Sequence, residues 1–402
     1  MSDAHGVAPR GAQPRAKETL TLTVGNQVLV GWQRVTVTRP LASIPASFSL
    51  EVTEKSPRGD AAIDIKPGAP CTVLIGSDLV LTGYVDRYSA TISPAIHSIR
   101  VDGRSKSEDL VDCSAVFGDI NQPGFQVVNS NTLAIVTALA KPYGIDVHST
   151  AGDGITIPQF NINLGETPWD IIDRVTRYSQ MLVYDQPDGS IMLAKVGTES
   201  MASGVSIGSQ GNAEQASVAL SMDGRFSEYE GHLTSILTFG TDAGIATPTV
   251  GKVVKDEGVP RFRKRYVISE QSVLGAFIVN DRAVWEMNKR MGQSYQLDAT
   301  IDSWRDSKGK LWEPNKLAPI SAPVLKLADV SYIIASVSYV RDERGEHAEL
   351  RLMPREAFFV EPIGSLGYVS LEDATSNNNP TQKQTDINLP TDRGAQPTTA
   401  VG

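Results

Sequence analysis

The most constraining feature of the sequence is a period-two alternation of apolar and polar residues that recurs in short runs. Leu20, Leu22 and Val24 alternate with threonines, and further runs of this kind follow. Because successive side chains of a strand point to opposite faces, the pattern predicts strands with one buried face. Short strands with little helix predict a small, closed or nearly closed β-barrel over residues 18–115, since closure removes exposed strand edges.

The middle of the chain, residues 116–200, has a different pattern, which predicts an α+β insert domain. Residues 131–141 are apolar at helical spacing. A second helix is expected to begin at Thr167, a good N-cap residue that is followed by Pro168 and Asp170. A β-hairpin is expected after this helix.

Strand patterns return over residues 201–360, which we interpret as a second β-barrel-like domain with one long helix at about residues 275–291. The expected fold class is therefore a β-rich α+β multidomain chain, in which two small β-barrel-like domains flank an α+β insert. Residues 1–17 are expected to form a flexible N-terminal arm. Residues 361–402 are rich in Asn, Gln, Thr and Pro and are expected to form a disordered C-terminal tail.

Composition argues against several classes of protein. The 402 residues carry a formal net charge of −9, which disfavours a protein that binds nucleic acid by neutralising phosphates. Two cysteines, Cys71 and Cys113, are too few for a disulfide scaffold or a cysteine-based zinc cluster. No run approaches the roughly 18 apolar residues of a membrane-spanning helix, so no membrane insertion is expected.

One catalytic pattern occurs in the chain, but its surroundings do not support it. Residues 204–208 read Gly-Val-Ser-Ile-Gly, which matches the nucleophile elbow of α/β-hydrolases. That motif needs a buried strand before the serine and a helix after it, whereas the stretch 197–215 has the small, polar composition of a linker. The five histidines are scattered and lack metal-ligand spacing. No catalytic, cofactor-binding or metal-ligating residues are therefore assigned, and no enzyme is expected.

The densest charged segment is 261–265, which reads Arg-Phe-Arg-Lys-Arg. In a strand, Arg261, Arg263 and Arg265 would face one way. Two interpretations stay open for them: a solvated strand face, or a contact with an acidic neighbouring subunit or a phosphate backbone. Trp312 lies in a short loop and is a further interface candidate, with packing over a barrel end as the alternative. These four residues are the candidate subunit-interface or partner-interface residues.

Three stretches of the chain resemble the baseplate hub proteins of Mu-type contractile-tail phages, the late-control or tail hub family. The stretches are residues 32–52, residues 103–113 and residues 263–358. The third is the most specific, and it includes the sequence Leu-Trp-Glu-Pro-Asn at 311–315. The resemblance depends on the order and spacing of these pieces rather than on one short motif.

This resemblance implies a homotrimeric ring at the distal end of the tail tube, which joins the tube to the central spike and lets DNA pass. Family subunits carry two similar β-barrel domains, so three copies would give a pseudo-sixfold ring that fits a hexameric tube onto a threefold spike. The implied partners are further copies of the chain, the spike, the tube and other baseplate proteins, with DNA only in passing. The implied location is the virion's tail baseplate, after synthesis in the bacterial host cytoplasm. No cofactor is implied.

Two other functions stay open. A spike-hub component of a type VI secretion system or a tailocin shares the fold, but such proteins usually fuse the hub to a C-terminal spike of repeating strand segments. Residues 361–402 are too short and irregular for that spike. The other alternative, a baseplate-borne cell-wall hydrolase, is less favoured because the sequence offers no catalytic constellation.

Overall fold

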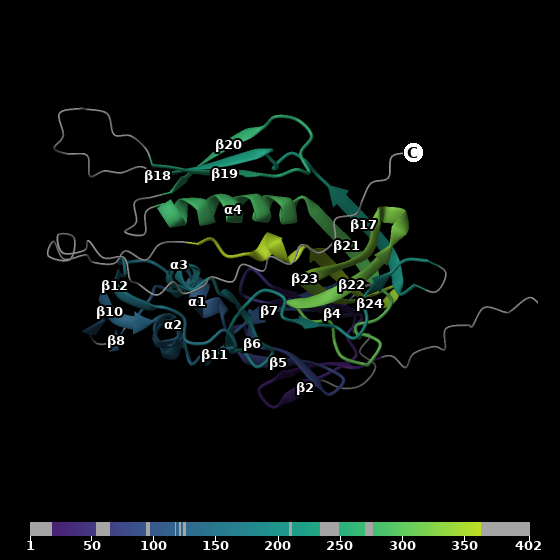
Figure 1. Cartoon of the computed structure of the whole chain (residues 1–402). Coiled ribbons are helices and arrows are strands. Elements are labelled where there is room, and N and C mark those ends of the chain that lie inside the picture. The colour runs from purple at the N-terminus through teal and green to yellow at the C-terminus, as the bar shows by residue number, and fades with distance from the viewer. Residues whose placement is uncertain are drawn as a thin grey trace, which may run out of the picture. The chain divides into compact units, whose positions relative to one another are not determined.

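The structure is a computed structural model, and its β-rich α+β class agrees with the class expected from the sequence (Figure 1). The described residues are 18–53, 65–93, 97–116, 118–119, 122–123, 126–208, 211–233, 249–269 and 276–362. The arm at 1–17 and nearly all of the tail at 361–402 lie outside these residues. None of the described helices has the length and apolar content that a membrane span needs.

Fourteen of the described strands form one sheet. Its path runs β17-β21-β24-β23-β3-β4-β7-β6-β5-β1-β2, while β22 pairs with β23 and with the short strands β15 and β16. The strands are β1 (Leu20–Val24), β2 (Gln27–Leu29), β3 (Arg34–Pro40), β4 (Ser47–Thr53), β5 (Pro70–Ile75), β6 (Asp78–Ile92), β7 (His97–Ser105), β15 (Glu199–Ser200), β16 (Val205–Ser206), β17 (Ala213–Leu220), β21 (Tyr295–Ile301), β22 (Lys316–Ala322), β23 (Leu327–Asp342) and β24 (Gly345–Met353).

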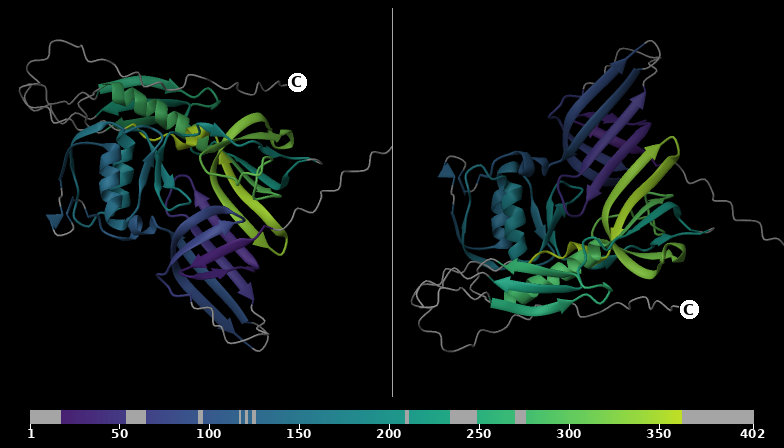
Figure 2. Two further views of the ribbon diagram at one scale, coloured as in Figure 1. Left: turned by 90° about the horizontal axis from the view of Figure 1, so that it is seen from below. Right: turned by 90° about the horizontal axis from the view of Figure 1, so that it is seen from above.

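The two β-rich regions are joined edge to edge. Strand β3 pairs antiparallel with β23, which places Val37 opposite Tyr339. Figure 2 shows the purple N-terminal strands and the yellow-green strands of the C-terminal region side by side. One hydrophobic core draws residues from both regions, including the fully buried Leu50 and Leu352. No closed barrel is found among the described strands, because β2 and β17 each have a single partner. The pairing of β3 with β23 covers one edge of each strand. Closure of a barrel was expected to cover such edges instead.

The α+β insert expected in the middle of the chain has its own core. Its strands are β8 (Gly118–Asp119), β9 (Gln122–Pro123), β10 (Gln126–Asn131), β11 (Val147–Ser149), β12 (Thr156–Asn161), β13 (Leu182–Asp185) and β14 (Ile191–Ala194). Its helices are α1 (Glu108–Asp112), α2 (Thr132–Ala140), η1 (Lys141–Tyr143) and α3 (Pro168–Tyr178). The start of α3 is as predicted: the Thr167 hydroxyl accepts the Asp170 N–H at 3.1 Å, and the Asp170 carboxylate accepts the Thr167 N–H at 3.1 Å.

A second small α/β unit lies between β17 and β21 in the sequence. Strands β18 (Glu228–Leu233), β19 (Thr249–Lys255) and β20 (Lys264–Ser269) form a separate sheet, and α4 (Ala276–Gln293) packs on one face of it (Figure 1). Tyr229, Val267 and Ala283 are buried between the helix and the sheet. The long helix expected within the second β-rich region is thus present, but it covers this separate sheet.

The stretch 197–215 is part of the fold, so the expectation of a linker is wrong. Strands β15 and β16 pair parallel with β22, and Met201 and Val205 are buried in the main core. The remaining described elements are η2 (Pro323–Leu325), between β22 and β23, and η3 (Arg355–Phe358), after β24. The domain boundaries drawn from the sequence stay predictions.

Candidate interaction surface

The arginine segment lies at the start of β20, beside α4. Strand β20 begins at Lys264, so Arg261 and Arg263 precede it. Arg263 donates hydrogen bonds to the carbonyl oxygens of Met222 (2.7 Å) and Asp223 (2.9 Å). Arg265 donates from Nε to Glu286 Oε1 at 3.1 Å. Arg263 and Arg265 therefore do share a side, and it is the side that faces the helix of the same chain.

The ring of Phe226 organises these guanidinium groups. The guanidinium carbons of Arg263, Arg265 and Arg290 lie 5.0, 5.4 and 5.5 Å from the ring centroid, within cation–π range. Glu286 also accepts from Arg290 at 2.7 Å, and the two residues form an i,i+4 pair on this helix. Arg263 and Arg265 thus help to hold α4 on the sheet, whereas Arg261 is exposed. A subunit-interface role for the three arginines stays a prediction.

A buried ion pair lies in the same unit and was not predicted from the sequence. Arg225 donates from Nε and Nη2 to the two carboxylate oxygens of Asp256, at 2.9 and 2.8 Å. The two side chains are only 2% and 6% exposed. The pair joins the segment before β18 to the turn after β19. No sequence motif marks it, because its members are 31 residues apart and each stands in an ordinary polar stretch.

Trp312 is packed in the hydrophobic core, which agrees with the packing alternative given for it rather than with the interface interpretation. Its side chain is fully buried. The indole N–H donates to the Ser303 carbonyl at 3.0 Å, and the Tyr339 hydroxyl donates to the Trp312 carbonyl. The loop folds back on itself through a bridge between Arg305 and Leu311, which places Trp312 beneath the surface.

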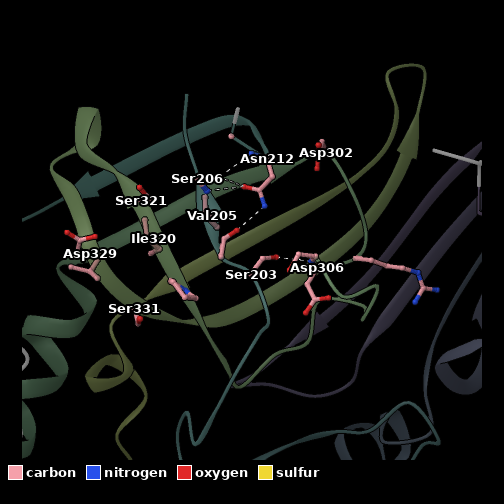
Figure 3. A pocket seen from close by; sticks show the side chains of 16 residues that line it. Ser203, Val205, Ser206, Asn212, Asp302, Asp306, Ile320, Ser321, Asp329 and Ser331 are labelled. Carbon is pink, nitrogen blue, oxygen red and sulfur yellow. Dashed lines mark hydrogen bonds between the residues drawn. The ribbon is translucent and has the colours of Figure 1, made fainter. Parts of the chain in front are cut away.

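A cleft of about 640 Å³ is lined in part by Gly204, Val205 and Ser206 of the Gly-Val-Ser-Ile-Gly stretch (Figure 3). Ser206 lies in β16, and its N–H donates to Asn212 Oδ1 at 2.9 Å. Asn212 Nδ2 donates to the Gly204 carbonyl at 2.9 Å, so this side-chain amide bonds to the free edge of β16 as a neighbouring strand would. A parallel strand pair surrounds Ser206 in place of the strand–turn–helix of a nucleophile elbow.

A group of carboxylates surrounds Arg104 where β7 leads into α1. Arg104 Nε lies 2.6 Å from Asp86 and 3.1 Å from Glu108, and Nη2 lies 2.8 Å from Asp112. Burial and then the charge of Asp86 raise the pKa of Glu108 to about 8 from an ordinary value of 4.5, despite the opposing charge of Arg104. Glu108 is therefore largely protonated in the folded protein near neutral pH.

This raised pKa predicts a dependence of stability on pH. Between about pH 4.5 and 8 the folded chain holds a proton on Glu108 that the unfolded chain has lost, so the free energy of unfolding falls as pH rises. The substitution Glu108→Gln should reduce this slope, as measured by urea denaturation at several pH values. Asp112→Asn, which removes a more exposed carboxylate on the same arginine, should leave the slope in place. An equal slope in Glu108→Gln and the parent would contradict the assignment.

Three family models of phage baseplate proteins match successive parts of the chain. Residues 19–105 match the N-terminal domain of Mu phage baseplate assembly protein GpP-like proteins, and residues 107–195 match the second domain of baseplate hub protein gp44-like proteins. Residues 276–361 match the fourth domain of Mu phage baseplate assembly protein GpP. The three matches follow the order of the chain, and the resemblance to the Mu-type baseplate hub family is confirmed.

The chain is also similar to individual phage baseplate and tail proteins. The chain is 28% identical to baseplate hub protein gp44 of Escherichia phage Mu over 357 residues, which cover 86% of this chain and 90% of gp44. It is also similar to the 43 kDa tail protein of prophage MuSo2 from Shewanella oneidensis, with a TM-score of 0.74, 28% identity, and coverage of 85% of this chain and 100% of that one. A tail protein from Neisseria meningitidis MC58 shares the fold, with a TM-score of 0.69, 20% identity, and coverage of 86% and 99%.

The fold also occurs in a more distant setting. A chain of the Francisella PdpA-VgrG complex matches with a TM-score of 0.51 and 10% identity, over 88% of this chain and 55% of that chain. At this identity the likeness concerns the fold alone.

Proposed function

We propose that the chain is the structural baseplate hub of a contractile phage tail. In this proposal three copies form a ring that joins the tail tube to the central spike and allows DNA to pass. The observation that carries the proposal is the edge-to-edge pairing of β3 with β23, which unites two β-rich regions in one sheet. A subunit with two such regions suits a threefold ring that must meet a sixfold tube. The likeness to gp44 over most of both chains supports it.

The charge of the chain is compatible with a passage for DNA. A net charge of −9 on each copy repels a polyanion, whereas a basic lumen would retain it. In this proposal the protein's partners are the spike, the tube and other baseplate proteins, and its location is the baseplate of the virion, after synthesis in the host cytoplasm. Its role is structural rather than enzymatic.

The first test is the mass of the protein in solution. Because a head-to-tail contact closes naturally into a ring, static light scattering at micromolar concentration should give three times the chain mass of 43.2 kDa. A chain that stays monomeric alone and also with its spike protein would exclude the ring.

A second candidate is the hub of a type VI secretion or tailocin particle, favoured by the fold shared with the Francisella complex. Gold-labelled antibody against the chain distinguishes the two in electron micrographs of particles from producing cells. Label at the distal end of tails that carry DNA-filled capsids supports the phage hub, whereas label only on particles without capsids supports the second candidate.

A further inference from the structure

The cleft around β16 is lined by small polar residues and by carboxylates. Its lining includes five serines and two glycines, and its charged residues are Asp302, Arg305, Asp306 and Asp329. Figure 3 shows Asp329 on one side of β16, and Asp302 and Asp306 on the other. The single cation is already matched, because Arg305 donates to Glu18 at 2.8 Å and to Asp78 at 2.6 Å. The cleft therefore presents negative charge on two sides, and we call it the aspartate cleft.

The three aspartates of the cleft differ in how far the fold uses them. Asp306 is buried, and its carboxylate accepts three backbone N–H groups. Asp302 and Asp329 are exposed. Among the described residues, no hydrogen bond or ion pair joins the Asp329 carboxylate to another side chain or to the backbone. The φ of Asp329 is 54°, a conformation that favours glycine and that aspartate tolerates better than most residues. Asp302 and Asp329 are the carboxylates that a ligand in the cleft would reach.

The described part of the chain begins one side chain away from this cleft, at Glu18. Arg305 lines the cleft, and its Nε and Nη2 donate to the two carboxylate oxygens of Glu18, each at 2.8 Å. The Glu18 N–H donates to Glu346 at 3.3 Å, and Arg341 donates to the Glu18 carbonyl. Three side chains thus hold both the backbone and the carboxylate of Glu18. The residues that precede Glu18 are therefore tethered beside the cleft.

The segment that precedes Glu18 has the opposite charge. Residues 8–17 read Ala-Pro-Arg-Gly-Ala-Gln-Pro-Arg-Ala-Lys, with three cations and no acid, and we call them the arm segment. Its small residues suit a cleft lined by small side chains. Its two prolines favour an extended polyproline conformation, which lowers the entropy lost on binding. At ~3.1 Å per residue, Arg10 and Arg15 would stand about 15 Å apart, so they can meet carboxylates on different sides of β16.

We propose that the arm segment binds in the aspartate cleft of the same copy, with Arg15 on the Asp302 side and Arg10 at Asp329. The arm segment is the occupant because the anchor at Glu18 gives it a high effective concentration at the cleft. The guanidinium groups supply charge-assisted hydrogen bonds to the carboxylates, and the cleft supplies a surface of matching size. The inference does not depend on the ring, since the arm segment and the cleft belong to one chain.

The main test is the rate at which trypsin cuts the Arg10–Gly11 bond, because a bound segment cannot enter the protease. The full chain and a synthetic peptide of residues 1–17 are digested in one low-salt solution, and both products are followed by mass spectrometry. The bond should be cut more slowly in the chain by about fivefold or more, as expected for two exposed ion pairs. Salt at about 0.5 M should bring the chain's rate toward that of the peptide.

The double variant Asp302→Asn, Asp329→Asn should abolish most of this protection. Asparagine keeps the shape of both side chains and also accepts the left-handed backbone at position 329. An unchanged urea midpoint shows that the variant is folded. Asp153→Asn is the matched control, because Asp153 is an exposed aspartate outside the cleft, and its rate should equal that of the parent. A parent chain that is cut as fast as the peptide, or a folded double variant that stays protected, would overturn the proposal.

A second measurement locates the arm segment without changing the cleft. The photoreactive residue benzoylphenylalanine is placed at Ala12, between the two arginines, and copies labelled with ¹⁴N and ¹⁵N are mixed before irradiation. Links from position 12 to residues 203–206 or 329–331 within one copy are expected. Links found only between differently labelled copies would show that the arm segment binds a neighbour, and links found only outside the cleft would show that it binds another surface. Either result overturns the proposal and leaves the ring untouched.

Discussion

Replacement of Arg225 by methionine should lower the local free energy of unfolding of the β18–β20 unit by about 3–5 kcal/mol. The substitution leaves the Asp256 carboxylate, 6% exposed, without the guanidinium that now bonds both of its oxygens. The carboxylate would keep the hydrogen bond from the Gly258 N–H, but the loss of its charged partner would leave the cost of its burial largely uncompensated. Hydrogen exchange of the β18 amides measures the effect, because it reports on this unit separately from the rest of the chain.

Two further variants define what the ion pair contributes. Arg34→Met is the matched control, since Arg34 and Glu343 form an ion pair with side chains 60% and 88% exposed, and it should cost about 1 kcal/mol or less. Arg225→Met combined with Asp256→Leu removes both charges and should recover much of the loss. Equal effects of Arg225→Met and Arg34→Met would show that burial of the pair is unimportant.

Local patterns in the sequence predicted the local structure well. The period-two runs became strands, and the expected positions of the helices were close to those observed. The start of α3 was predictable because Thr167, Pro168 and Asp170 act within a single helical turn. The buried face of β21 was also predictable from local sequence, because alternate residues of a strand point to the same side. Leu297 and Ala299 are both buried on that side.

Long-range relations were not predictable from those patterns. The joint of β3 with β23 brings together residues about 300 positions apart, such as Thr38 and Ser338, and alternation says nothing about which strand pairs with which. The residues of 197–215 look like a linker because β15 and β16 have two residues each, too few to show a period.

The surroundings of the arginine segment 261–265 also depend on long-range packing that local patterns do not predict. The alternation correctly grouped Arg263 with Arg265, but it could not say which face of the strand the helix would cover. The exposed apolar residues of the other face, such as Tyr266, could be identified only once α4 was placed. The sequence could not decide between an interface and a packing role for Trp312, because a short loop between glycine and proline is compatible with both. In the structure its side chain is fully buried, and the Tyr339 hydroxyl donates to its carbonyl.

Replacement of Trp312 by alanine should therefore destabilise the protein by about 3–5 kcal/mol, the cost of emptying a large buried aromatic site. The side chain is fully buried, and its indole N–H donates to the Ser303 carbonyl. The urea concentration at the midpoint of unfolding of the main sheet should fall markedly. The fluorescence of the remaining tryptophans measures this transition. Trp312→Phe should lose less, because it keeps most of the ring volume.

Phe262→Ala provides the contrasting case, because it removes an aromatic ring that is 76% exposed and should change stability by about 0.5 kcal/mol or less. The two substitutions should therefore differ sharply in their effect on stability. Trp312→Ala should lower the urea midpoint, and any loss of the ring should follow from unfolding. Phe262→Ala should leave the midpoint unchanged, because the ring is exposed. A Trp312→Ala protein that stays as stable as the parent but fails to assemble would return Trp312 to the interface, and would mean that its loop opens when copies meet.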